Sequence, residues 1–161
     1  MSKTNYPLEY ISWEKVEQLS YNIVYKIKKN NIKIDVIIPI LRGGMPIALL
    51  LSSMLDVSDM ACIHIRRSKD DNPNTEFGSP INKGITNIEV IKDANILIVD
   101  DTLDSAKTLD YATRIIQEYK PKSINIASLY NFNKDTFKKV YSGEEVVSYK
   151  WVVFPWEDKK I

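Results

Sequence analysis

Residues 96–108 read ILIVDDTLDSAKT, in which an apolar run leads into two aspartates and then a third aspartate among small and hydroxyl residues. An apolar run of this length without polar alternation is typical of a parallel strand that is buried on both faces. The pattern predicts a buried strand over residues 95–99 that ends in the carboxylates of Asp100 and Asp101. Helical spacing after it predicts a helix from about Ser105 to Tyr119.

The segments on either side of this stretch alternate between strand and helix patterns. Helices are predicted over residues 12–30, with Ser12 as the N-cap, and over residues 46–55. Apolar and β-branched runs predict strands at residues 34–40, 61–65, 123–129 and, at an edge or in a small hood, 146–154. Strands that alternate with helices predict an α/β domain with a parallel sheet.

The composition is that of one ordinary globular domain spanning residues 1–161. Hydrophobic residues make up 44% of the chain, and 22 basic residues balance 21 acidic ones, which excludes a disordered chain and argues against a nucleic-acid partner. A single cysteine, Cys62, and a single histidine, His64, exclude a disulfide scaffold and a Cys/His zinc site. With no signal-peptide core at the N-terminus and no apolar run near the ~20 residues of a membrane span, we expect a soluble cytoplasmic protein with no membrane partner.

Candidate functional residues follow the strand that ends at Val99, because ligands of parallel α/β sheets bind at the carboxyl ends of strands. Asp100 and Asp101 can accept hydrogen bonds from vicinal hydroxyls or hold Mg²⁺ through water. The turn over residues 104–108 can direct backbone N–H groups at a phosphate, so that a sugar phosphate would fit both halves. Alternatively, the two acids are merely solvated, and Asp104 or Ser105 is only a helix N-cap.

Two other phosphate-related motifs fit this stretch less well. The segment ending in Lys107 and Thr108 lacks both glycines of a P-loop, so nucleotide hydrolysis is not expected. A phosphoacceptor domain normally carries its acid pair after the first strand, whereas here the pair follows the third predicted strand. The phosphoacceptor domain stays as a weaker alternative.

Residues 96–108 resemble the phosphoribosyl-pyrophosphate signature of the type I phosphoribosyltransferases, an apolar strand followed by two acids, two variable residues and D-[ST]-G-x-T. Ala106 stands where that family usually has glycine. The resemblance implies that Asp100 and Asp101 hold the ribose hydroxyls and Mg²⁺, and that Asp104 is the catalytic general base. It also implies a 5′-phosphate site made of Asp104, Ser105, Ala106, Lys107 and Thr108.

A second resemblance lies in residues 40–48, ILRGGMPIA, which look like the first pyrophosphate loop of this family in its xanthine-guanine and related purine members. The resemblance implies that Arg42 and Gly43 bind pyrophosphate. The guanidinium of Arg42 offers a fork of donors for phosphate oxygens, and a glycine lets the backbone pass close to the ligand. Taken alone, the segment is also compatible with a plain turn from strand to helix.

The third resemblance concerns residues 151–157, WVVFPWE, which are similar to the segment that closes the base pocket in the same purine enzymes. It implies that Trp151 stacks on the nucleobase and that the backbone of Val152 hydrogen-bonds the base edge. Alternatively, these residues belong to the core of an edge strand. Phe132 stands where purine enzymes carry a lysine that reads the 6-oxo group, and Lys134 could replace that lysine only in a rearranged loop.

Together the three resemblances imply an α/β fold with a central, mostly parallel sheet, flanking helices and a small C-terminal hood. They imply Mg²⁺-dependent transfer of a phosphoribosyl group from phosphoribosyl pyrophosphate to a purine base, in purine salvage, by a homodimer or homotetramer. The polar, turn-rich residues 67–88 are predicted to form a long loop that serves as the flexible lid. The alternative is a non-catalytic module that senses phosphoribosyl pyrophosphate or a nucleotide.

Overall fold

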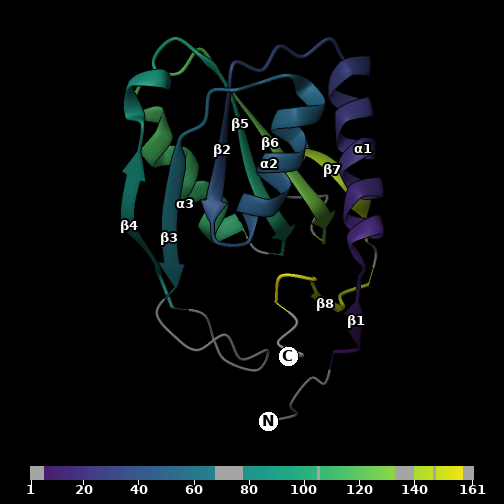
Figure 1. Cartoon of the computed structure of the whole chain (residues 1–161). Coiled ribbons are helices and arrows are strands. Elements are labelled where there is room, and N and C mark those ends of the chain that lie inside the picture. The colour runs from purple at the N-terminus through teal and green to yellow at the C-terminus, as the bar shows by residue number, and fades with distance from the viewer. Residues whose placement is uncertain (1–5, 68–77, 105, 133–139, 147, 158–161) are drawn as a thin grey trace.

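A six-stranded sheet lies at the centre of the computed structural model, which describes residues 6–67, 78–104, 106–132, 140–146 and 148–157 (Figure 1). The strand order is β4-β3-β2-β5-β6-β7, and every neighbouring pair is parallel except β3 and β4. The strands are β2 (Val36–Leu41), β3 (Cys62–Arg67), β4 (Pro80–Thr86), β5 (Asn95–Leu103), β6 (Ser123–Asn131) and β7 (Val140–Glu145). The predicted α/β fold with a mostly parallel sheet is confirmed.

Helices cover both faces of this sheet. α1 (Trp13–Lys29) and α2 (Gly44–Leu55) pack on one face, and α3 (Ala106–Gln117) packs on the other. Side chains of β5 alternate between the two layers: Leu97 and Val99 lie in the core under α1 and α2, whereas Ile96 and Ile98 lie in the core under α3. This alternation explains why the strand is apolar on both faces.

The predicted helices and the four central strands are confirmed, with small changes at their ends. Ser12 caps α1 as expected, because its Oγ accepts a hydrogen bond of 3.3 Å from the backbone N–H of Lys15. β5 is longer than the sequence indicates, since Asp100 still pairs with Ser128 of β6 and the strand ends at Leu103. The two carboxylates therefore lie in the last part of the strand and not beyond it.

Two predictions at the sheet edges are wrong. Residues 67–88 are not one long loop, because β4 runs antiparallel to β3 and is followed by a short 3₁₀ helix, η1 (Ile88–Val90). Residues 68–77 of the predicted lid lie outside the described residues. Among the described residues of 146–154, the strand is β8 (Trp151–Val153), so the predicted bounds are too wide, and the edge of the main sheet is formed by β7.

A second, two-stranded sheet is formed by β8 and β1 (Leu8–Tyr10), which are parallel. We use the name hood for β1, β8 and the turn that runs from β8 to Glu157. Figure 1 shows β8 beyond the ends of β2 and β5 that their arrowheads mark. The structure thus favours the hood over the edge strand as the place of residues 151–153.

In the described part of the chain, no helix combines the length and the apolar character that crossing a membrane would need.

Candidate active site

The loop after β2 and the acidic end of β5 lie side by side. β2 and β5 are parallel neighbours, with Pro39 opposite Val99, so both strands deliver their carboxyl ends to the same edge of the sheet. Arg42 is exposed in the loop after β2, and the peptide bond between Leu41 and Arg42 is cis. The structure therefore brings together Arg42 and Asp100, which were predicted from separate motifs.

Both glycines of the loop are in contact with β5. A β-carbon on Gly43 would lie 2.0 Å from Oδ2 of Asp101, and one on Gly44 would lie 2.3 Å from the carbonyl oxygen of Val99. Real β-carbons do not approach other atoms so closely, so neither position can take a side chain without movement. The absence of side chains is what lets the loop and the start of α2 rest directly on the acidic strand end.

Asp101 is the most strongly perturbed carboxyl group of this cluster. Burial and the nearby negative charge of Glu157 raise its pKa to about 6, with a smaller contribution from Asp104. The backbone N–H of Thr102 opposes the shift by donating to Oδ1 of Asp101 at 2.7 Å. The carboxyl groups of Asp101, Asp104 and Glu157 thus lie near one another at the end of β5. Such a cluster favours a ligand that brings hydroxyl donors or a cation.

The carboxylates at the end of β5 fit an Mg²⁺ ion that is bound by protein and substrate together. Among the described residues, no group of three or more His, Cys, Asp or Glu side chains is arranged to hold a metal ion on its own. Mg²⁺ usually keeps several waters and is bound through one or two carboxylates together with substrate phosphates. Asp100 and Asp101 could supply those carboxylates.

The predicted phosphate turn connects β5 to α3. Asp104 lies directly after β5, α3 begins at Ala106, and Ser105 is outside the described residues. Lys107 is exposed in the first turn of α3 and Thr108 is half-buried. The first N–H groups of a helix have no partner within it and carry partial positive charge, so this turn is suited to an anion at the same edge of the sheet.

In the hood, the backbone of β8 is oriented away from its partner strand at Val152. The N–H of Trp151 donates to the carbonyl of Pro7 at 2.9 Å, and the N–H of Ile11 donates to the carbonyl of Val153 at 3.1 Å. Backbone groups of successive strand residues point to opposite sides, so the N–H and C=O of Val152 point away from β1. The side chain of Val152 is buried, and that of Trp151 is half-buried.

Phe132 is part of a row of aromatic rings. Its ring lies 5.1 Å from that of Tyr149 and 6.2 Å from that of Tyr130, and its N–H donates to the carbonyl of Leu103 at 2.9 Å. An apolar ring, packed against other rings, thus stands at the position where the purine enzymes that the sequence resembles carry a lysine. Lys134 lies outside the described residues.

Glu157 is a site residue that sequence reasoning missed. Its carboxylate accepts a hydrogen bond of 3.1 Å from the N–H of Phe154, and its charge acts on Asp101. The turn after β8 therefore reaches the acidic end of β5, although the two are far apart in the sequence. The only signal in the sequence is that an acid ends the quoted WVVFPWE segment, and nothing there indicates which strand it meets.

Solved structures share this fold over nearly the whole chain. A hypothetical protein from Neisseria gonorrhoeae with bound ppGpp is 19% identical, with a TM-score of 0.82 over 96% of this chain and 92% of its own. A purine phosphoribosyltransferase from Pyrococcus horikoshii is 26% identical, with a TM-score of 0.71 over 96% of both chains. The xanthine-guanine-hypoxanthine phosphoribosyltransferase of Helicobacter pylori is 22% identical, with a TM-score of 0.71 over 95% of this chain and 94% of its own.

No curated protein sequence is significantly similar to the chain. A family model does match it, that of the phosphoribosyl transferase domain, over residues 9–158. This match includes the loop after β2, the acidic strand end, the turn before α3 and all of the hood except Leu8. The chain therefore belongs to the phosphoribosyl transferase domain family.

Proposed function

We propose that this phosphoribosyltransferase acts on a purine base in purine salvage. It would transfer the 5-phosphoribosyl group of phosphoribosyl pyrophosphate to the base, which yields a nucleoside monophosphate and pyrophosphate. The observation that carries the proposal is the contact between Gly43 and Asp101, which supports it because the loop that we assign to pyrophosphate touches a carboxylate that we assign to the ribose. Family membership over residues 9–158 supports the same reaction.

The parts of the sugar substrate are assigned to three neighbouring segments. Asp100 and Asp101 accept hydrogen bonds from the ribose hydroxyls at the end of β5. The turn over residues 104–108, namely Asp104, Ser105, Ala106, Lys107 and Thr108, binds the 5′-phosphate at the start of α3. Arg42 and the backbone of Gly43 bind the pyrophosphate that leaves.

Catalysis by these residues is mostly positioning and electrostatic stabilisation, because the ribose carbon develops positive charge as pyrophosphate departs. Carboxylates on the ribose face stabilise that charge. Asp104 is assigned as the general base that takes a proton from the purine. Mg²⁺, when bound through Asp100 and Asp101, would neutralise charge on the pyrophosphate oxygens.

The base is assigned to the space between the hood and the end of the main sheet. Trp151 stacks on the ring, and the outward backbone groups of Val152 hydrogen-bond its edge. Similarity to the Pyrococcus purine phosphoribosyltransferase supports a purine. Because Phe132 offers no hydrogen bond from its side chain, the base edge is read by backbone groups, and lysine is not required.

A panel of bases tests this proposal. The protein is incubated with Mg²⁺, labelled phosphoribosyl pyrophosphate and each common purine or pyrimidine in turn, and nucleotide formation is measured. We expect product with at least one purine and none with pyrimidines. Tight binding of phosphoribosyl pyrophosphate without product from any base would contradict the proposed enzymatic function.

A second candidate function is a non-catalytic module that senses a phosphorylated nucleotide. It is supported by the Neisseria gonorrhoeae protein, whose structure contains ppGpp, and by the departures from the family pattern at Ala106 and Phe132. The same panel separates the two candidates, because turnover with any base excludes a purely sensory role. Calorimetric titration with ppGpp would measure the affinity that the sensory role requires.

The oligomeric state also belongs to the proposal. We expect a homodimer or homotetramer, by analogy with the family. Size-exclusion chromatography with light scattering would show a mass of two or four chains of 18.6 kDa.

A further inference from the structure

The geometry points to Lys150 as a positioning residue for the base pocket. Its ammonium group joins the hood to the edge of the main sheet and so sets where Trp151 and Val152 stand relative to the acidic end of β5. This inference rests on the proposed function, because it assigns the hood a purpose in holding a base. It adds a residue to which none of the three sequence motifs gave a role.

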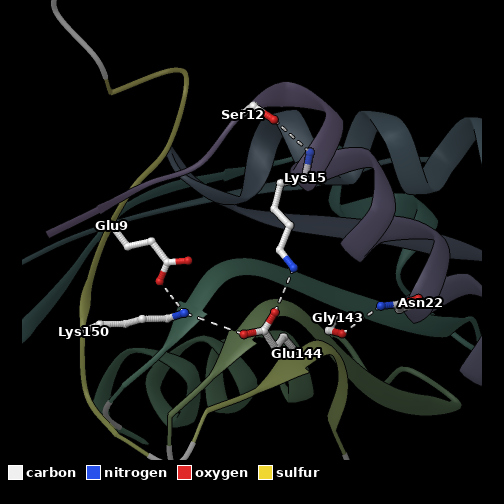
Figure 2. A network of polar contacts seen from close by, with 7 residues as sticks. All are labelled: Glu9, Ser12, Lys15, Asn22, Gly143, Glu144 and Lys150. Atoms are coloured by element: carbon white, nitrogen blue, oxygen red, sulfur yellow. Dashed lines mark hydrogen bonds and ion pairs between the residues drawn. The ribbon is translucent and has the colours of Figure 1, made fainter. Parts of the chain in front are cut away.

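Two carboxylates from different sheets hold the ammonium group (Figure 2). Nζ of Lys150 forms an ion pair with Oε2 of Glu9 in β1 and a second, of 3.7 Å, with Oε1 of Glu144 in β7. The side chain of Lys150 is only 21% exposed. An ion pair that is partly withdrawn from water is screened less than one on the open surface, so both partners restrict where the lysine can lie.

Glu144 is itself fixed from the side of α1. Its Oε2 accepts from Nζ of Lys15 at 3.0 Å, so positive and negative groups alternate from α1 through β7 to β1. Farther along the same helix, Asn22 donates to the carbonyl of Gly143 at 3.2 Å, which ties α1 to the same strand. Glu144 and its strand are thus held by contacts with α1, and Lys150 links the hood to Glu144.

The ring of Tyr130 is a third group in contact with the ammonium group of Lys150. Nζ of Lys150 lies 5.1 Å from the centre of the Tyr130 ring, which is fully buried in β6. Burial, together with the charges of Glu144 and Glu9, raises the pKa of Tyr130. Lys150 is thus held by β1, β6 and β7 at once.

Lys150 directly precedes β8, which carries the residues that we assign to the base. Trp151 is the next residue, and Val152 stands opposite Glu9 in the pairing of β8 with β1. A shift of the ammonium group would therefore move the residues assigned to the base, while the pyrophosphate loop and the turn before α3 belong to other elements. Loss of Lys150 should weaken the use of the base and leave phosphoribosyl pyrophosphate binding unchanged.

The test uses three variants of the full chain. Lys150→Met keeps the length and apolar stem of the side chain but removes the charge, and Lys150→Arg restores the charge. Lys33→Met is the matched control, because Lys33 pairs with Asp35 at 2.8 Å outside the hood. Hydrogen exchange of the amides of the hood, compared with those of β5, measures how firmly the hood is held.

We expect Lys150→Met to speed exchange in the hood roughly fivefold, with β5 unchanged, because the variant loses both ion pairs and partly exposed pairs contribute little each. The KM for the purine base should rise by a similar factor while the KM for phosphoribosyl pyrophosphate stays constant. Lys150→Arg should restore both values, and Lys33→Met should change neither.

The outcomes distinguish a failure of the positioning role of Lys150 from a failure of the proposed function. Unchanged hood exchange in Lys150→Met, or equal changes in both KM values, would overturn the positioning role. Failure of the wild-type protein to use any base would overturn the proposed function, and the exchange rates would still decide whether Lys150 holds the hood.

Discussion

The α-carbon of Gly43 lies against the carboxylate of Asp101, so closely that a β-carbon at position 43 would stand 2.0 Å from Oδ2. Arg42 precedes this glycine, and Asp100 precedes this aspartate. The groups that we assign to pyrophosphate and to the ribose hydroxyls are therefore held at a fixed separation by a contact that only glycine permits.

Gly43→Ala should weaken binding of phosphoribosyl pyrophosphate by about tenfold to a hundredfold, since small displacements of catalytic groups have effects of this size. The new methyl group must push the carboxylate of Asp101 aside. That carboxylate can rotate, so the thermal stability should change little. Calorimetric titration with Mg²⁺ and phosphoribosyl pyrophosphate measures the affinity, and an affinity equal to wild type would contradict the assignment.

Gly44→Ala should instead destabilise the fold, by about 1–3 kcal/mol. Its β-carbon would meet the backbone carbonyl of Val99 at 2.3 Å, and a backbone in the middle of the sheet cannot move aside as a side chain can. Denaturant unfolding of Gly43→Ala and Gly44→Ala under the same conditions checks the contrast. Equal stability of the two variants would show that the start of α2 can shift away from β5.

Asp104→Asn should reduce turnover at least about a hundredfold, because a general base contributes on this scale. Binding of phosphoribosyl pyrophosphate should persist. Asp110→Asn is the matched control, since Asp110 is exposed on α3 in the helix that follows the turn. Steady-state kinetics of both variants test the role, and full activity of Asp104→Asn would remove it.

Trp151→Ala should raise the KM for the base by roughly five- to a hundredfold, the range expected from loss of one stacking contact of about 1–3 kcal/mol. Trp151→Phe should retain most of the affinity. Tyr21→Ala provides a control in which an exposed aromatic side chain of α1 is removed. If the KM for the base is the same in all three variants, Trp151 belongs to the hood core only.

Asp35 predicts a pH dependence of stability that is separate from catalysis. Lys33, followed by the backbone N–H of Asn95, lowers the pKa of Asp35 from 3.8 to about 2. Because the pKa of Asp35 is lower in the folded than in the unfolded chain, the ionised carboxylate stabilises the fold at pH values above about 4. This stabilisation is lost as the pH falls from about 4 to about 2.

Asp35→Asn should therefore cost about 1 kcal/mol at pH 7, a value discounted for a side chain that is 30% exposed. The difference from wild type should vanish near pH 2. Thermal unfolding measured between these limits checks it. Kinetic constants should not change, because Asp35 precedes β2 and so lies at the end of the sheet opposite the site.

The centre of the fold was predictable because its strands are buried on both faces. Ile96, Leu97, Ile98 and Val99 alternate between the two helical layers, so all of them are apolar and the strand is recognisable locally. The loop after β2 and the acidic strand end were recognised for another reason. Residues 40–48 and 96–108 resemble motifs of the phosphoribosyltransferases, and the matching family model spans both segments.

The edges were not predictable by the same reasoning. β4 contains Lys83 and Gly84 and exposes much of its surface, so its composition resembles that of a loop. β7 reads VYSGEE, and Gly143 is buried because it packs against Leu19 of α1 and the carbonyl of Leu129 in β6. Glu157 and Lys150 act on groups far away in the sequence, and such contacts leave no local pattern.

The pairing of Leu8 with Trp151 has a consequence for the order of events during synthesis. By the time residues 151–153 leave the ribosome, β2, β5, α3 and β6 have already emerged. Long-range pairings form late, since they require both segments to be available. In a nascent chain, the segments that we assign to the sugar phosphate are thus available before those that we assign to the base.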